Sequence, residues 1–154
     1  MIKKSQANPK YILSVRESIL QAVVERVRGL SNTGLKVFRS RRAALGRLEL
    51  PAVVIEPVSD SGEGDNTTIY QDWQLLVSVR LFTRGDAPDV ASEALAAQIH
   101  SALMADGQLG GLALSITGTN VTYALEFSEG TACETQMEYQ INYRTPYDNW
   151  QQRM

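Results

Sequence analysis

The chain has 154 residues, of which 44% are hydrophobic and 21% charged, proportions that fit one globular domain and exclude a wholly disordered chain. The net charge of −2 argues against a general nucleic-acid binder, which would carry a basic surplus. The single cysteine, Cys133, excludes an intrachain disulfide, and with only one histidine, His100, the chain cannot build the usual zinc cage. No apolar run approaches the roughly 18 residues of a membrane span.

The first predicted element is an amphipathic helix over roughly residues 9–30. Its apolar positions recur every three or four residues and comprise Ile12, Val15, Ile19, Val23, Val27 and Leu30. This period predicts one buried stripe, with charged residues on the rest of the surface. Gly29 and the cluster at 32–34 should end the helix. We expect residues 1–8 to be flexible.

Three strands are predicted next. A short one covers residues 36–38, and a second covers 52–55 between Pro51 and Pro57, which suggests a place near a sheet edge. The third, at 73–82, alternates most clearly. Its helix-facing set is Trp73, Leu75, Val77, Val79 and Leu81, and its other face carries Gln74, Leu76, Ser78, Arg80 and Phe82. Between the second and third strands, residues 59–66 are polar and glycine-containing, so they predict a mobile loop.

A second helix and two long strands complete the predicted domain. Asp86 should cap the helix and Pro88 should occupy its first turn. Its expected buried stripe is Ala91, Leu95, Ile99, Ala102 and Leu103. The strands cover roughly 112–127, where Gly118 and Asn120 suggest a bulge or turn, and the segment that carries Met137, Tyr139, Ile141 and Tyr143 on one face. The polar tail at 147–154 should be loose.

The predicted architecture is therefore a single α+β domain over residues 1–154, with a core at about 9–146. The element order is α-β-β-β-α-β-β. We expect one mostly antiparallel sheet of about five strands, with both helices packed on one face, because short loops favour antiparallel pairing.

Candidate catalytic groups are few. Glu134 with Glu138, or Asp60 with Asp65, could form an acid–base pair, but solvated strand and loop carboxylates are the favoured interpretation. His100 is interpreted as a helix-end residue that interacts favourably with the helix dipole. Cys133 would need an activating base to act as a nucleophile, and the single histidine offers only one chance of that. The close glycines at 62–64 and 110–111 fit turns and no phosphate-binding pattern. We therefore predict no enzyme activity, catalytic residue, cofactor or metal.

The most unusual feature is a basic stretch with Arg39, Arg41, Arg42 and Arg47 and no acid before Glu49. Aromatic residues do not interleave with it, so the stretch gives only weak support for nucleic-acid binding. It is either a solvated basic loop or a protein-facing patch. A patch could meet the acidic loop of a neighbouring copy, a head-to-tail contact of the kind that builds rings. The face of the strand at 73–82 that mixes polar and apolar residues could be covered by core side chains or by a neighbouring copy. The predicted interface residues are Arg39, Arg41, Arg42, Arg47, Asp60, Glu63, Asp65, Arg80 and Phe82.

Several landmarks occur in a characteristic order along residues 10–147. They are Val23-Val24-Glu25-Arg26-Val27, Pro51-Ala52-Val53-Val54-Ile55, Asp72-Trp73, Val77-Ser78-Val79-Arg80-Leu81, Thr83-Arg84-Gly85-Asp86-Ala87, the helix end at 99–106, Leu109-Gly110-Gly111-Leu112-Ala113, and Tyr139-Gln140-Ile141-Asn142-Tyr143-Arg144-Thr145. This order resembles the lambda-type tail-terminator, or tail-completion, proteins of bacteriophages and prophages. The landmarks are strand, turn and helix-end patterns and not a catalytic signature.

The resemblance implies a sheet backed by helices and a homohexameric ring that caps the tail tube, ends its polymerisation and offers a head-docking surface. The implied partners are further copies, the tail tube protein and a head-completion or neck protein, with no cofactor, membrane or specific nucleic acid. The implied location is the bacterial host cytoplasm during assembly and then the virion tail.

Three alternatives remain at this point. A head–tail connector subunit of the same particle would bind the portal instead of the tube. A small ligand-binding or enzymatic α+β domain would need a deep pocket with convergent polar groups. A nucleic-acid accessory protein would use the arginine stretch, and its binding would weaken steeply with salt.

Overall fold

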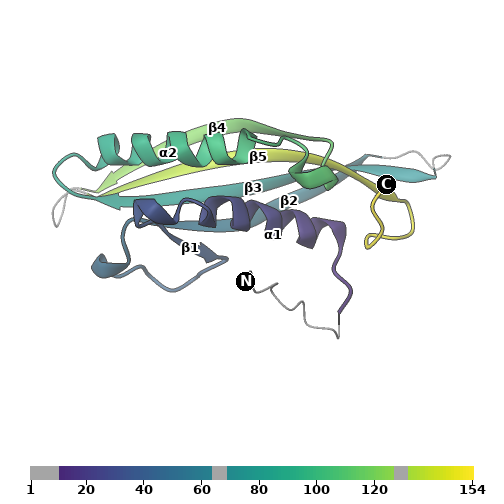
Figure 1. The fold of residues 1–154 in the computed structure, drawn as a ribbon, viewed down its shortest axis with the longest axis horizontal. Helices are drawn as coiled ribbons and strands as arrows, with labels where there is room; N and C mark the ends of the chain where they lie inside the picture. The colour runs from purple at the N-terminus through teal and green to yellow at the C-terminus, as the bar shows by residue number, and fades with distance from the viewer. Residues whose placement is uncertain (1–10, 64–68, 127–131) are drawn as a thin grey trace.

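The computed structural model describes residues 11–63, 69–126 and 132–154. It contains one five-stranded sheet in the order β1-β2-β3-β5-β4 (Figure 1). In chain order the elements are α1 (Val15–Arg28), β1 (Lys36–Arg39), β2 (Ala52–Glu63), β3 (Tyr70–Arg84), α2 (Pro88–Met104), β4 (Ser115–Glu126) and β5 (Ala132–Pro146). Only β1 and β2 pair in parallel. The predicted α+β class, element order and mostly antiparallel sheet are confirmed.

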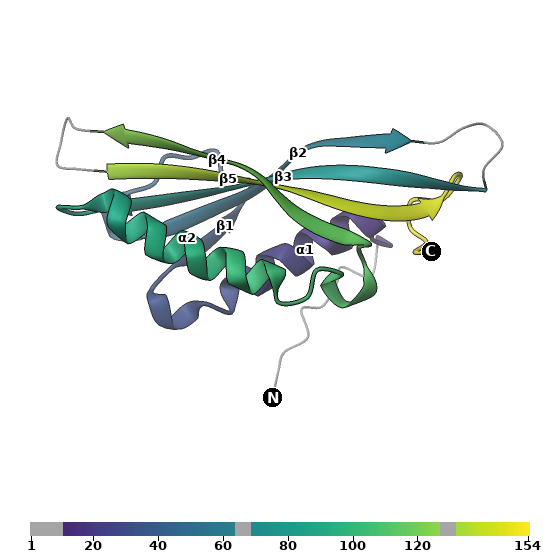
Figure 2. The same cartoon turned by 90° about the horizontal axis from the view of Figure 1, so that it is seen from above.

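Both helices lie on the same face of the sheet (Figure 2). One apolar cluster joins them to it, including Ile19 and Val23 of α1 and Ile99 and Leu103 of α2. The predicted inward set of β3 joins this cluster: four of its members are fully buried and Trp73 is partly buried. Alternation along β5 likewise buries Met137, Tyr139, Ile141 and Tyr143 as expected. We call the opposite side of the sheet the outer face.

Helix α1 is shorter than predicted. The extended backbone of Ser14 begins it, and the Ser14 hydroxyl accepts a 3.1 Å hydrogen bond from the Glu17 N–H. Ile12 therefore lies outside the helix and is 76% exposed.

Helix α2 starts with Pro88 in its first turn as expected, but the predicted Asp86 cap is wrong. Ala87 occupies the cap position and provides no side-chain hydrogen bond. Ala91 is exposed and Ser92 is buried in its place, where its hydroxyl hydrogen-bonds Thr135 of β5. The sequence gives no sign that Ser92 is buried, because its hydroxyl is hydrogen-bonded by a threonine that is distant in the chain.

Strand β2 differs most from expectation. Residues 52–55 lie one strand in from the edge of the sheet, because β1 pairs with them from Lys36 to Arg39, which agrees with the expected place near an edge. The strand also continues past Pro57 through a register shift and pairs with β3 as far as Glu63. The prediction of a mobile loop is therefore wrong for residues 59–63; residues 64–68, including Asp65, lie outside the described part of the chain. The bulge expected in β4 is confirmed between Gly118 and Asn120.

The C-terminal tail is packed, not loose. The Val15 N–H donates to the Trp150 carbonyl at 2.8 Å, and the Gln151 amide donates to the Ile12 carbonyl at 3.1 Å. The Trp150 ring meets Trp73 edge-on, with 5.7 Å between ring centroids. The tail thus joins the start of α1 to the sheet. Residues 1–8 and the turn predicted at 128–130 lie outside the described residues.

Candidate protein-interaction site

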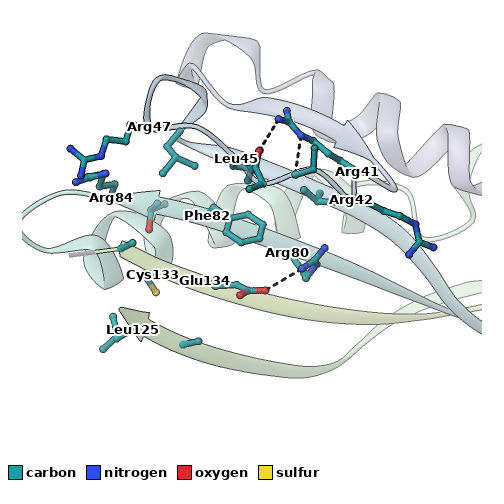
Figure 3. A pocket seen from close by; sticks show the side chains of 17 residues that line it. Arg41, Arg42, Leu45, Arg47, Arg80, Phe82, Arg84, Leu125, Cys133 and Glu134 are labelled. Carbon is teal, nitrogen blue, oxygen red and sulfur yellow. Dashed lines mark hydrogen bonds and ion pairs between the residues drawn. The ribbon is translucent and has the colours of Figure 1, made fainter. Parts of the chain in front are cut away.

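Residues 40–50, between β1 and β2, form a segment that we call the arginine loop. The loop lies over the outer face and encloses with it a pocket of about 660 Å³ (Figure 3). The sheet side of the pocket includes Arg80, Phe82 and Glu134, which alternate with the helix-facing residues of β3 and β5. The loop side includes Arg41, Arg42, Leu45 and Arg47. Five of the nine predicted interface residues therefore meet around one pocket.

Arg41 holds the arginine loop closed. Its guanidinium forms a two-pronged ion pair with Glu49, one contact being 2.9 Å, and donates to the carbonyls of Ala43 and Ala44 at 3.2 and 3.0 Å. The same group lies 4.5 Å from the Phe38 ring centroid. The hydrogen bonds from Arg41 to the Glu49 carboxylate, together with one from the Gly46 N–H, hold the pKa of Glu49 below its usual value. The loop therefore presents a defined surface.

The remaining cations of the basic stretch have different environments. Arg39 faces α1, where it binds both carboxylate oxygens of Glu17, one at 2.7 Å, and so lowers the pKa of Glu17. Arg42 and Arg47 are exposed, and among the described residues Arg42 has no ion-pair partner. Arg80 of β3 forms ion pairs with Glu56 at 3.2 Å and with Glu134 at 3.6 Å. The acids that pair with Arg39 and Arg80 thus come from other elements, whereas Glu49, which pairs with Arg41, belongs to the loop itself.

Of the predicted acidic partner surface, Asp60 is not where it was expected, Glu63 is exposed, and Asp65 lies outside the described residues. Asp60 points to the helix face, with 8% of its side chain exposed, and binds Arg16 at 2.5 Å and the Tyr143 hydroxyl. Burial, followed by this hydrogen bond to Asp60, raises the pKa of Tyr143. Glu63 is exposed at the end of β2. Interface roles for Arg42, Arg47 and Glu63 stay predictions, whereas Asp60 is engaged inside the molecule.

A second surface was not predicted. The α2–β4 groove has a volume of about 700 Å³ and is lined by Asp89, Val90, Glu93, Ala94, Ala97, Tyr123 and Leu125. The β4 side chains here face the same side as the helices, yet Tyr123 is 57% exposed and Leu125 46% exposed. Next to them Val121 is 48% exposed. The Tyr123 hydroxyl donates to Glu93 at 3.2 Å, and the Glu93 charge raises the Tyr123 pKa.

Strand β4 is also an edge of the sheet: β5 is its one partner among the described strands. Its other side presents backbone N–H and carbonyl groups that another strand could bind. The apolar alternation at Val121, Tyr123 and Leu125 was visible in the sequence, but alternation identifies a shared face without telling whether a helix covers it.

Two of the candidate catalytic residues, His100 and Cys133, contact side chains of β5. His100 Nδ1 lies 2.9 Å from the Tyr139 hydroxyl, and the two rings stack with centroids 5.8 Å apart. Burial raises the pKa of Tyr139 to about 12. Cys133 is buried, with its sulfur 3.7 Å from the Thr135 hydroxyl. Within residues 11–63, 69–126 and 132–154, no three His, Cys, Asp or Glu side chains cluster as metal ligands would.

No protein-family model matches the chain, and no curated protein matches it. Among the described helices, none is long and apolar enough to cross a membrane.

Proposed function

We propose that this chain is a structural subunit that caps a bacteriophage tail tube as a homohexameric ring. In this role it ends tube polymerisation and provides the surface to which the head docks. Its partners would be further copies, the tail tube protein and a head-completion protein. The ordered sequence landmarks support the proposal, and the sheet backed by two helices is the fold that their resemblance implies.

The observation that carries self-association is the uncovered apolar edge at β4. Val121, Tyr123 and Leu125 are each about half exposed and line one side of an open sheet edge. A contiguous apolar surface of this kind favours a protein partner, because covering it removes apolar area from water. The edge of β4, which has no further partner among the described strands, adds backbone groups that another strand or loop could bind.

The arrangement of the two surfaces favours a ring over a simple dimer. The arginine loop lies over the outer face, and the α2–β4 groove lies on the helix face. Contacts between two unlike surfaces are head-to-tail, and head-to-tail contacts close into a ring when their rotation divides a full turn. Each subunit then uses both surfaces at once.

The direct test is to add the purified protein to growing tubes of a cognate phage tail-tube protein. We expect elongation to stop and electron micrographs to show a sixfold ring at one tube end. Tubes that lengthen unchanged, with no density at either end, would contradict the proposal. Binding to a portal ring in place of the tube would assign the chain to the head–tail connector.

A further inference from the structure

We infer that the α2–β4 groove is filled by the arginine loop of a second copy of this chain. The inference rests on the proposed ring and adds to it the residues that meet between neighbours. Two surfaces of one molecule support it, because their polarity and charge are complementary.

The receiving surface is apolar with an acidic rim. Val90, Ala94 and Leu125 are among its apolar lining residues, which we call the floor. Asp89 and Glu93, one helical turn apart on α2, form the rim and are exposed. No described cation pairs with either carboxylate, although Glu93 accepts the Tyr123 hydroxyl. Such a site fits an apolar side chain accompanied by arginine or lysine.

The arginine loop has that composition. Leu48 is 93% exposed, the highest exposure among the large exposed hydrophobic residues of the described chain. Around it the loop holds three arginines, Arg41, Arg42 and Arg47, against one acid, Glu49. The guanidinium groups of Arg42 and Arg47 point outward at opposite ends of the loop (Figure 3).

Hydrogen bonds also hold the arginine loop in one conformation before it binds. The Arg41–Glu49 pair closes it, and Lys36 donates a 3.1 Å hydrogen bond to the Leu48 carbonyl. A surface held in one conformation loses less conformational entropy on binding than a flexible one.

The geometry selects a second copy over two other occupants. The arginine loop of a chain lies over the outer face, whereas α2 lines the groove from the helix face; among the described residues, Leu125 of the edge strand β4 is the one that lines both. Two grooves facing one another would bring Asp89 and Glu93 against the same acids of the partner, which like-charge repulsion disfavours. The loop of a neighbour satisfies both the apolar floor and the acidic rim.

Disulfide trapping tests this contact directly. Chains carrying Leu48→Cys are mixed with chains carrying Val90→Cys under mild oxidation and analysed on a non-reducing gel. We expect a covalent dimer from the mixture and little from either variant alone, because the contact is head-to-tail. Leu114→Cys, at a residue 49% exposed outside the groove, replaces Val90→Cys as the matched control and should give no dimer.

A charge exchange tests the same contact without a new bond. Arg42→Glu and Glu93→Arg should each weaken self-association about tenfold or more, and the double variant should recover most of the loss. If the wild-type protein forms a ring while the mixture does not cross-link and neither charge variant weakens association, the inference is overturned and the ring stands. A wild-type protein that stays monomeric and leaves tube growth unchanged overturns both proposals.

Discussion

The two ends of the sheet use similar residue types in opposite ways. At the end where β3 begins and β5 finishes, Arg16 lies over Trp73 and Trp150 and binds Asp60. We call this the closed end. At the end where β5 begins and β4 finishes, the arginine loop and the α2–β4 groove face solvent. We call this the open end (Figure 2).

The difference separates residues that stabilise the fold from residues left for a partner. At the closed end a cation, an acid and aromatic rings satisfy one another inside the chain. At the open end Arg42, which has no ion-pair partner among the described residues, extends from the loop on the outer face, whereas the apolar groove beside Asp89 and Glu93 lies between α2 and β4 on the helix face. Substitutions at the closed end should therefore change stability, and substitutions at the open end should change association.

The largest effect on stability is expected from Asp60→Ala. It removes the acceptor from both Arg16 and the Tyr143 hydroxyl. We expect the free energy of unfolding to fall by about 3 kcal/mol, since a largely buried charge loses its partner. Urea denaturation measures this, with Glu63→Ala, an exposed acid of the same strand, as the control. The control should change stability by less than about 0.5 kcal/mol; equal losses would remove the distinction.

A smaller loss is expected from Trp150→Ala. The substitution removes the edge-on contact with Trp73 and the ring 5.0 Å from the Arg16 guanidinium carbon. We expect a loss of about 1–2 kcal/mol, because the ring is half exposed and its contacts are partly screened. Thermal or urea unfolding gives the value. Tyr147→Ala, also in the tail and 65% exposed, should have little effect; a similar loss there would show that the tail acts in another way.

A pH-dependent effect is expected from Glu17→Gln. Arg39 lowers the pKa of Glu17 in the folded state, so the pair stabilises the protein above the unfolded-state value of 4.5 and loses its effect as pH falls through the lower folded value. Since both side chains are about a third exposed, the loss at pH 7 should be below about 1 kcal/mol. Unfolding at a series of pH values should show the two proteins converging in acid; a constant difference would contradict this.

The smallest change in stability is expected from Val90→Asp at the open end. Val90 is 66% exposed and lies in the first turn of α2, where an acid interacts favourably with the helix dipole. Unfolding free energy should change by less than about 0.5 kcal/mol. Self-association should nevertheless weaken strongly, because the substitution places a charge on the apolar floor of the groove. A loss of stability equal to that of Trp150→Ala would show that the groove belongs to the folded core.

Local pattern predicted the parts of the fold that depend on neighbouring residues. Alternation located β3 and β5 and chose their buried faces, and the 3.6-residue period located α1. The extension of β2 beyond Pro57 depends on pairing with β3 and on Asp60 reaching Arg16 and Tyr143. The packing of Trp150 likewise depends on contacts across the chain. Such contacts leave no local signal in a polar segment.

The same difference between local patterns and contacts across the chain applies to the candidate site. The sequence identified the arginines, and the structure added their acids, Glu17, Glu56 and Glu134, from other elements. The α2–β4 groove was missed because its exposure depends on where α2 lies relative to β4. No run of residues encodes that distance.

The most direct test of self-association through the open end is the mass in solution of the wild-type protein and of Val90→Asp, measured by light scattering across concentration. We predict a discrete wild-type species near six times the 17.0 kDa subunit and a folded Val90→Asp protein of much smaller mass. A wild-type protein that remains monomeric at every concentration, or a variant that assembles as well as the wild type, would contradict the account.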